Sequence, residues 1–415
     1  MCCIQKGLIF PAKAGILAFL ILFLLTSWVT GDEHGRMLEP ELRSKSAVLF
    51  DYETGTLLYE KEADTMLPPA SMTKLMTLHL VYRAIEEGRI EPGTVVRIGE
   101  SGDFHNLPRR SSLMFLEAGQ EVTVRQLMQG LAVPSGNDAA VVLAELVSGS
   151  VEDFVAEMNW EADRLGLHDM HFVDPAGLNE ENRVTAREFG RFCMYYISSH
   201  PEALRELHDI EEFTYPSEED VKNGEPASLG PITQENYNVL IGRHPWVDGL
   251  KTGYIDESGY NIALTAAAGD RRLVAILLGG PGDSPREGAL TRAIDGLHLL
   301  TYGFFAFERI VPDPPAIGPV RIWKGEARYV AAAPITPAPM VVPAAIACSL
   351  SWEWDTEQLL TAPLSRDEQI GALRLMNGRE MLAEYPLYPV KDVKTGGWLR
   401  RMIDSLLLFL KNIFG

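Results

Sequence analysis

The spacing of apolar positions changes several times along the chain, and each change marks a different kind of element. Short apolar runs flank a Glu-Thr-Gly turn at 53–55 and predict a β-hairpin over Ala47–Tyr59. From Pro69 onward, apolar residues recur at helical spacing as far as Gly88, where we expect the helix to stop. The chain therefore passes from two strands into a helix.

The middle of the chain is predicted to be helical. Three pairs resemble capping boxes, Thr123 with Gln126, Ser150 with Asp153 and Thr185 with Glu188, and they predict helices near 124–133, 151–165 and 186–197. Apolar runs then predict strands over 246–254, 260–268 and 272–279, the last two joined by a Gly-Asp turn, and a helix over 286–307. Strands at both ends of a helical segment indicate an α+β domain with one sheet.

The last hundred or so residues are organised differently. Four prolines between Ile310 and Pro319 predict a linker over 309–319, and short alternating runs with an Asn-Gly turn at 377–378 predict a small β-rich domain over 320–390. Residues 396–415 have the pattern of an amphipathic helix with a cationic face and Trp398 at its start, which suits a helix lying in an anionic membrane interface. The alternative is a C-terminal helix packed into a core.

The first 31 residues contain Lys6 and Lys13 and no acidic residue, and they are almost wholly apolar from Ala14 to Val29. This layout is typical of a signal peptide, with Gly31 as a cleavage point. The run is also just long enough to span a bilayer uncleaved. Both readings predict that the rest of the chain is exported.

The composition of the chain limits the classes of protein to which it can belong. The chain has 415 residues, 46% of them hydrophobic and 23% charged, which is ordinary globular usage. Lys and Arg total 37 against 57 Asp and Glu, so the net charge of −20 disfavours binding to nucleic acid. Beyond the N-terminal segment, Cys193 and Cys348 are too few and too far apart for a disulfide framework.

Three short motifs carry candidate chemistry. Ser71 and Lys74 stand three residues apart at the start of the first predicted helix, so an amine able to act as a base lies one turn from a hydroxyl. Ser135 and Asn137 stand on a loop between two predicted helices, and Lys251-Thr252-Gly253 lies in a predicted strand. Each motif alone is a weak signal. A second Lys-Thr-Gly tripeptide, at 394–396, is interpreted as linker sequence.

The ordered set of the three motifs is specific, because it is the signature of penicillin-recognising serine enzymes. The longer stretches 69–77, 134–140, 172–178 and 248–254 resemble the low-molecular-mass penicillin-binding proteins that are D-alanyl-D-alanine carboxypeptidases. The resemblance covers nearly the whole chain. It implies a β-lactamase/transpeptidase-like domain over 37–308, with an antiparallel sheet and a helical subdomain, followed by the β-rich domain and the amphipathic helix.

The resemblance also implies roles for the motif residues. Ser71 would be the acylated nucleophile, Lys74 its general base and Ser135 a proton relay, while Asn137 would hold the substrate amide. Lys251 and Thr252 would bind the terminal carboxylate, beside Gly253, and the backbone N–H groups of Ser71 and Tyr254 would form the oxyanion hole. Arg286 matches a family arginine near that carboxylate, and a solvated arginine at a helix start is the alternative for it.

The expected function is removal of the terminal D-Ala from peptidoglycan stem peptides at the outer, periplasmic face of the cytoplasmic membrane, with β-lactams as covalent inhibitors and no cofactor. Alternatives on the same fold are a DD-endopeptidase and a β-lactamase, and a different class is an inactive wall-binding scaffold. A class A β-lactamase needs a glutamate where this chain has Pro175, which disfavours rapid deacylation. His168 and His171 are read as surface residues, because no further metal-ligand set accompanies them.

Overall fold

The computed structural model describes residues 37–218, 220, 228–356 and 359–414. The chain divides into a short unit, Met1–Glu41, and a large unit, Leu42–Gly415, and the fold described here is that of the large unit. The predicted signal peptide, residues 1–31, lies outside the described residues.

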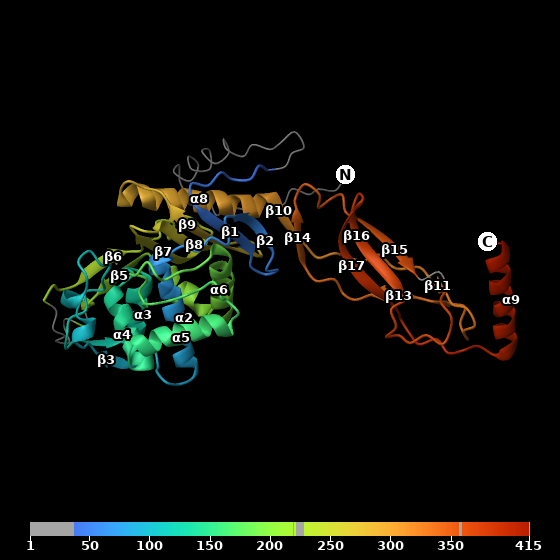
Figure 1. Ribbon diagram of the computed structural model, residues 1–415, viewed down its shortest axis with the longest axis horizontal. Helices are drawn as coiled ribbons and strands as arrows, with labels where there is room; N and C mark the ends of the chain where they lie inside the picture. Colours follow the sequence, from blue (N-terminus) through green and yellow to red (C-terminus); the bar gives the residue numbers. More distant parts are fainter. Residues whose placement is uncertain (1–36, 219, 221–227, 357–358, 415) are drawn as a thin grey trace. The chain divides into compact units, whose positions relative to one another are not determined.

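A five-stranded antiparallel sheet in the order β2-β1-β9-β8-β7 forms the centre of the first part of this unit (Figure 1). Its strands come from both ends of the segment, which confirms the predicted α+β class: β1 Ser46–Asp51, β2 Leu57–Lys61, β7 Val247–Ile255, β8 Gly259–Ala268 and β9 Arg271–Gly280. The two predicted hairpins, β1–β2 and β8–β9, are both present. β7 is an edge strand, so one side of its backbone has no neighbouring strand in this sheet.

The sheet is apolar on both faces, and β1 shows why its sequence reads as a continuous apolar run. Alternate residues of a strand point to opposite faces. Ala47 and Leu49 pack into one core cluster, while Val48 and Phe50 pack into the other. Every residue of β1 is buried, because helices cover both sides of the sheet.

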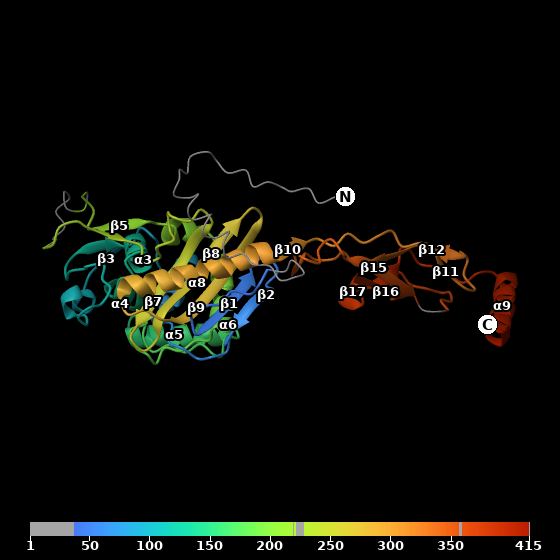
Figure 2. The same ribbon diagram turned by 90° about the horizontal axis from the view of Figure 1, so that it is seen from above.

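One face is covered by the long helix α8, Pro285–Ala306, which lies across the strands (Figure 2). Its start is well defined, because Pro285 opens the helix and the Ser284 side chain accepts a hydrogen bond of 3.2 Å from the Glu287 N–H. Gly303 lets the helix pack closely, since a Cβ there would lie 2.6 Å from Leu49 Cδ2. The predicted helix over 286–307 is confirmed.

The other face is covered by helices from the middle of the chain: α2 Lys74–Glu86, α3 Val124–Ala132, α4 Asn137–Ser148, α5 Val151–Arg164 and α6 Ala186–Ser199. Shorter elements connect them: the 3₁₀ turns η1 Ala70–Thr73, η2 Glu100–Gly102 and η3 Phe104–Asn106, the π-helical turn η4 Leu204–His208, and the strand pairs β3 Val95–Arg97 with β4 Glu121–Thr123 and β5 Glu212–Tyr215 with β6 Ile232–Glu235.

The three predicted helix caps are present in different degrees. Thr123 and Gln126 form a complete reciprocal capping box at α3. At α6, Thr185 accepts from the Glu188 N–H, but the Glu188 carboxylate turns to the Asp169 N–H at 2.6 Å instead of returning to the cap. The sequence pattern predicted this helix start correctly, although the Glu188 side chain bonds to the backbone of a residue outside the helix.

The last part of the chain is rich in strands, as predicted. A four-stranded sheet in the order β13-β17-β16-β15 buries Ile322, Leu373 and Leu387, and the Asn-Gly turn at 377–378 joins β16 to β17. The strands are β10 Phe307–Ile310, β11 Val320–Arg321, β12 Tyr329–Val330, β13 Ala332–Pro334, β14 Met340–Pro343, β15 Ser351–Thr356, β16 Gly371–Asn377 and β17 Glu380–Pro389. β10 pairs with β14, and β11 with β12.

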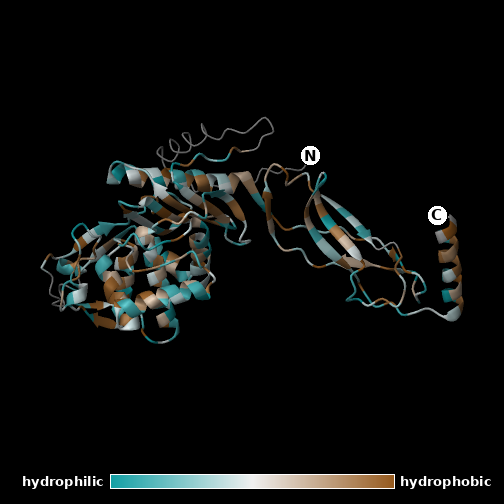
Figure 3. Ribbon diagram, in the orientation of Figure 1, coloured by the Kyte–Doolittle hydropathy of each residue, from teal (hydrophilic) through white to brown (hydrophobic). Residues whose placement is uncertain are grey.

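The C-terminal helix α9, Trp398–Phe414, carries many exposed apolar side chains. Figure 3 shows hydrophobic residues along this helix in brown. The exposed fractions of Met402, Leu406 and Phe409 are 57%, 59% and 62%, so the alternative of a helix packed into a core is wrong for these residues. Asp404 on its opposite side is 7% exposed and accepts a hydrogen bond of 2.6 Å from the Lys324 N–H. Within the described residues, no helix is both long and apolar enough to cross a bilayer.

The second Lys-Thr-Gly tripeptide, 394–396, precedes α9. The Glu326 N–H donates to the Lys394 carbonyl and the Gly396 N–H to the Lys324 carbonyl, both at 2.8 Å. This segment is therefore attached to the β-rich part by backbone hydrogen bonds, and it forms no strand longer than a single bridge.

Candidate active site

Ser71 and Lys74 meet where the 3₁₀ turn η1 passes into α2. Lys74 Nζ lies 2.9 Å from Ser71 Oγ, as the three-residue spacing predicts for one helical turn. The lysine is completely buried, whereas the serine is partly exposed. The structure therefore presents a hydroxyl to solvent with an amine behind it.

Lys74 has two further partners that fix its amine. Its Nζ donates to Asn137 Oδ1 at 2.7 Å and to the Ala176 carbonyl at 2.6 Å. Burial lowers the pKa of Lys74 from its ordinary value to about 7, and the nearby carboxylates of Asp174 and Asp138 offset this only in part. Near neutral pH, a large fraction of this amine is therefore unprotonated and able to accept a proton.

The loop before α4 brings the second motif to the same place. Ser135 is buried in a left-handed backbone conformation, with φ of 60°. Its Oγ has no hydrogen-bond partner among the described residues, so its hydroxyl remains available to a bound molecule. Asn137 is the first residue of α4, and its N–H donates to the Ser112 carbonyl at 2.8 Å. Ser135 thus lies in the loop just before α4, and Asn137, at the start of that helix, reaches Lys74.

Asp138 is a residue of this site that the sequence analysis did not single out. It is completely buried, and its carboxylate accepts from the backbone N–H groups of Met114, Leu116 and Ala139. Burial raises the pKa of Asp138, although these N–H donors oppose the shift. The carboxylate joins segment 113–116 to α4 and so holds the Asn137 backbone in place. Its only signal in the sequence is an acidic residue in the first turn of a helix.

The loop over 174–179 forms another wall of the site. Asp174 Oδ1 accepts from the N–H groups of Ala176 and Gly177 at 2.7 and 2.6 Å, and Oδ2 accepts from Asn179 at 2.8 Å. Thr77 on α2 donates to the Pro175 carbonyl at 2.6 Å. These bonds aim the Ala176 carbonyl at Lys74. The resemblance covered this stretch, but the loop's contact with the amine was not predicted.

The third motif lies on the edge strand β7. Lys251 and Thr252 are both buried, and Lys251 Nζ lies 3.3 Å from the Thr252 carbonyl. Burial lowers the pKa of Lys251 well below its ordinary value, and the neighbouring cations Lys74 and Arg292 lower it further. A Cβ at Gly253 would lie 3.1 Å from the Ser71 backbone nitrogen, so glycine lets the strand approach the serine turn closely.

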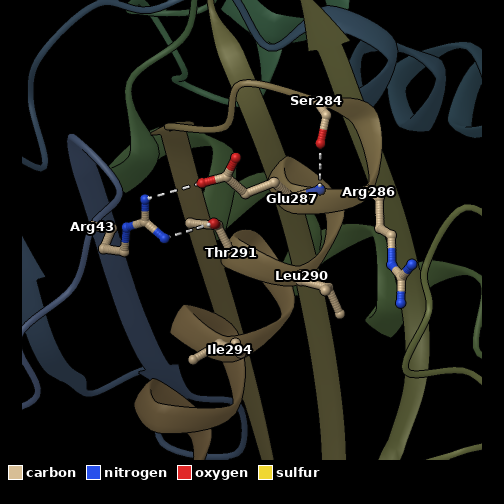
Figure 4. Close-up of a pocket in the computed structure, with 7 residues that line it drawn as sticks. All are labelled: Arg43, Ser284, Arg286, Glu287, Leu290, Thr291 and Ile294. Carbon is tan, nitrogen blue, oxygen red and sulfur yellow. Dashed lines mark hydrogen bonds and ion pairs between the residues drawn. The ribbon is translucent and has the colours of Figure 1, made fainter.

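Two predicted site residues lie farther out. Tyr254 is 46% exposed, stacks on Tyr260 with ring centroids 4.3 Å apart, and donates to Asp256 Oδ1 at 2.6 Å. Arg286 is exposed on the first turn of α8 and lines a shallow pocket with Arg43 and Glu287 (Figure 4). In Figure 4 its side chain points away from those two residues.

A different arginine contacts the third motif directly. Arg292 on α8 is 6% exposed, and its Nη1 lies 3.3 Å from the Gly253 carbonyl and 3.4 Å from the Asn261 carbonyl. Arg292 was not predicted, because a buried arginine on the inner side of a long helix has no local sequence pattern that distinguishes it.

The two histidines of segment 168–171 are exposed, in agreement with their assignment to the surface. His168 Nδ1 lies 3.4 Å from Asp163 Oδ1. No group of three or more His, Cys, Asp or Glu side chains among the described residues is arranged to hold a metal ion.

Comparison with known proteins agrees with this geometry. A family model described as D-alanyl-D-alanine carboxypeptidase matches residues 34–282, and one described as penicillin-binding protein 5, C-terminal domain, matches residues 310–395. The D-alanyl-D-alanine carboxypeptidase DacF of Bacillus subtilis is 30% identical over 406 residues, 96% of this chain and 96% of that protein.

Solved structures agree as well. Penicillin-binding protein 5 of Haemophilus influenzae superposes with a TM-score of 0.68 at 29% identity, over 86% of this chain and 99% of that one. The ampicillin-bound form of penicillin-binding protein D2 of Listeria monocytogenes superposes with a TM-score of 0.54 at 27% identity, over 65% of this chain and 100% of that one. This chain belongs to the D-alanyl-D-alanine carboxypeptidase family.

Proposed function

We propose that this protein is a serine D-alanyl-D-alanine carboxypeptidase that removes the terminal D-Ala of a peptidoglycan pentapeptide through an acyl-enzyme on Ser71. The observation that carries the proposal is the buried amine of Lys74, 2.9 Å from Ser71 Oγ. With its pKa lowered by burial to about 7, this amine can act as a base at the pH where the enzyme would work.

Acylation follows from these positions. Ser71 Oγ attacks the carbonyl carbon of the penultimate D-Ala while Lys74 takes the hydroxyl proton. The peptide C–N bond then breaks, and the leaving amine receives a proton through Ser135, whose buried Oγ has no other partner among the described residues. Water later adds to the ester carbonyl, the bond to Ser71 Oγ breaks, and the serine recovers its proton.

The edge strand β7 supplies the groups that would bind the end of the substrate. Lys251 and Thr252 bind the terminal carboxylate, and the N–H groups of Ser71 and Tyr254 form the oxyanion hole. The close approach permitted by Gly253 supports that pair of donors. Burial and neighbouring cations lower the pKa of Lys251, and an incoming carboxylate would offset this by stabilising its charged form.

The remaining site residues have supporting roles in this proposal. Asn137, whose Oδ1 accepts from Lys74, would hold the substrate amide through its own amide nitrogen. Arg286 remains a predicted contact of the terminal carboxylate. Arg292, which contacts the Gly253 carbonyl, holds β7 from behind.

Penicillin and related β-lactams would acylate Ser71 in the same way. The ampicillin-bound relative from Listeria monocytogenes supports this, since it shares the fold at 27% identity. The loop that faces Lys74 has Pro175 where a class A β-lactamase has its activating glutamate, so hydrolysis of the penicilloyl ester should be slow.

We also propose the arrangement of the chain in the envelope. Residues 1–31 direct export, 37–308 form the catalytic domain, 309–319 the linker, 320–390 the β-rich domain, and 396–415 a helix that lies on the periplasmic surface of the cytoplasmic membrane. The exposed apolar side chains of α9 support the last assignment. Truncation before Trp398 should give an active enzyme that no longer binds vesicles of anionic lipid, and continued binding would contradict the anchor assignment.

Intact-mass spectrometry after exposure to penicillin, beside a Ser71→Ala variant, tests the chemistry. The proposal expects a stable adduct on Ser71 and release of D-Ala from a pentapeptide. Rapid loss of the adduct with consumption of the drug would indicate a β-lactamase, and cleavage of cross-linked peptides without D-Ala release would indicate an endopeptidase. Absence of any adduct would indicate an inactive scaffold.

A further inference from the structure

His208 is a buried histidine directly behind the Lys-Thr-Gly strand, and the mechanism above makes no use of it. It closes the π-helical turn η4 and is 1% exposed. Its Nδ1 lies 2.9 Å from the Leu250 carbonyl oxygen, and its Nε2 lies 2.9 Å from the Tyr196 hydroxyl. π-Helical turns are rare and occur frequently at functional sites.

The partners of His208 determine its protonation. A carbonyl oxygen only accepts, so Nδ1 carries the proton and donates to Leu250. Burial lowers the pKa of His208 to about 3, and the charge of Lys251 also lowers it, so the ring is neutral. Its Nε2 then accepts from the Tyr196 hydroxyl, which fixes the plane of the ring.

This hydrogen bond matters because of the strand it reaches. β7 is an edge strand, and in an antiparallel pair the backbone groups of alternate residues face the neighbour or face away. The Leu250 carbonyl faces His208, which lies on η4 and not on the neighbouring strand β8. The backbone groups of Thr252 and Tyr254, two and four residues on, therefore face the same outward side, where the substrate would lie.

Other contacts show that η4 and its surroundings hold this stretch firmly. A Cβ at Gly249 would lie 3.3 Å from His208 Cβ, so the strand and the turn are in close contact. Asn238 Nδ2 lies 3.4 Å from the Gly249 carbonyl, and Asn236 Nδ2 lies 3.4 Å from the His208 carbonyl. The hydrogen bond from His208 to the Leu250 carbonyl, at 2.9 Å, is shorter than these two contacts and lies next to Lys251 in the chain.

We propose that His208 is a positioning residue for recognition of the substrate's terminal carboxylate: by holding the Leu250 carbonyl it fixes the strand segment that carries Lys251 and the outward-facing backbone groups of Thr252 and Tyr254. The inference rests on the proposed carboxypeptidase function and assigns it a selectivity determinant outside the three motifs. Loss of this bond should weaken discrimination between a peptide that ends in a carboxylate and the same peptide ending in a carboxamide.

The test compares acylation rates of the full chain with D-Ala-D-Ala peptides that end in a carboxylate or a carboxamide. His208→Ala should lower the carboxylate-to-carboxamide ratio by about tenfold or more. His208→Asn keeps a nitrogen donor at the Nδ1 position and should recover most of the ratio, whereas His208→Gln, whose amide lies farther out, should not. If His208→Ala does not fold, the carboxylate-to-carboxamide ratios of His208→Asn and His208→Gln are compared instead.

His200→Asn is the matched control. His200 is also 1% exposed, and burial lowers its pKa to about 3 as well, but its Nε2 bonds to His79 instead of β7. Its loss should lower the melting temperature and leave the selectivity ratio unchanged. A wild-type ratio in His208→Ala, or equal ratios in the asparagine and glutamine variants, would overturn the inference. Failure of the wild type to release D-Ala would instead contradict the proposed function.

Discussion

Gly177 packs directly against the carbonyl group of Ala70, the residue that precedes Ser71. A Cβ at position 177 would overlap the Ala70 carbonyl oxygen and lie 2.8 Å from Thr73 Oγ1. Gly177 also has a φ of +79°, which side chains disfavour. The loop that reaches Lys74 through the Ala176 carbonyl is therefore fitted against the turn that carries the serine, with room only for glycine.

Gly177→Ala should consequently impair both stability and acylation. We expect the free energy of unfolding to fall by about 3 kcal/mol, from steric overlap added to backbone strain. Acylation by a fluorescent penicillin should slow about tenfold or more, because the Ser71 turn must shift. Urea unfolding and labelling rates measure the two effects.

Gly166→Ala is the matched control for this substitution. Gly166 has a φ of +72°, but nothing lies within 4 Å of the position a Cβ would take. It should lose only about 1–2 kcal/mol from backbone strain and keep its labelling rate. Equal effects of the two substitutions would contradict the proposed contact between the loop and the serine turn.

The rate of acylation should depend on the protonation of Lys74. Because its pKa is lowered to about 7, the amine is protonated and inactive as a base below that pH and becomes active above it. The second-order rate constant for penicillin should therefore rise about tenfold per pH unit below pH 7 and level off above it. Lys74→Arg, which stays protonated throughout, should show no such rise, and a rise retained in that variant would exclude Lys74 as the base.

The side chain of Tyr254 should matter less than its backbone. Its hydroxyl bonds to Asp256 at the exposed rim, and this bond raises the pKa of the phenol to about 12. Tyr254→Phe should change acylation by less than about fivefold. Tyr254→Pro removes the N–H of the proposed oxyanion hole on an edge strand, where proline is tolerated, and should slow acylation by about 100-fold or more. Similar losses in both variants would assign the role to the side chain instead.

The buried carboxylate of Asp404 should hold α9 to the β-rich part of the chain. Its hydrogen bond to the Lys324 N–H is 2.6 Å long, and Lys324 has a φ of 58°. Loss of such a bond costs about 1.5–3 kcal/mol, so chymotrypsin should cut α9 about tenfold faster or more in Asp404→Ala. Ser405→Ala, at an exposed neighbouring position, is the control, and equal cleavage of both variants would refute the attachment.

The sequence predicted the order of elements well, because each depends on local patterns. Residues 47–50 are apolar at every position, since β1 is buried on both faces, and the turn residues at 53–55 and 377–378 mark their hairpins. The predicted start of α8 at 286 lies one residue from the observed start at Pro285. These signals involve neighbours in the chain, which a sequence displays directly.

The features that were not predicted depend on partners distant in the chain. Asp138 is an ordinary acidic residue in a helix start until its contacts with 114 and 116 are known. Arg292 and His208 have no motif around them, and their contacts with β7, at Gly253 and Leu250, lie more than thirty residues away in the chain. The left-handed backbone of Ser135 likewise arises from the packing of its loop, since serine has no intrinsic preference for it.

An edge strand with free backbone groups can pair with a strand of another chain. The outer edge of β7 has to remain unpaired if a peptide is to bind there. Edge strands commonly avoid aggregation through bulges and through charges placed within the strand. β7 has features of this kind: its register with β8 shifts between Val247 and Gly249, and Lys251 is a buried ionisable residue in its interior. A long apolar strand could not form a continuous hydrogen-bond ladder here and would have to cover the buried amine of Lys251. A short peptide with a terminal carboxylate meets neither obstacle, so the features suited to the substrate also keep copies of the protein from associating through this edge.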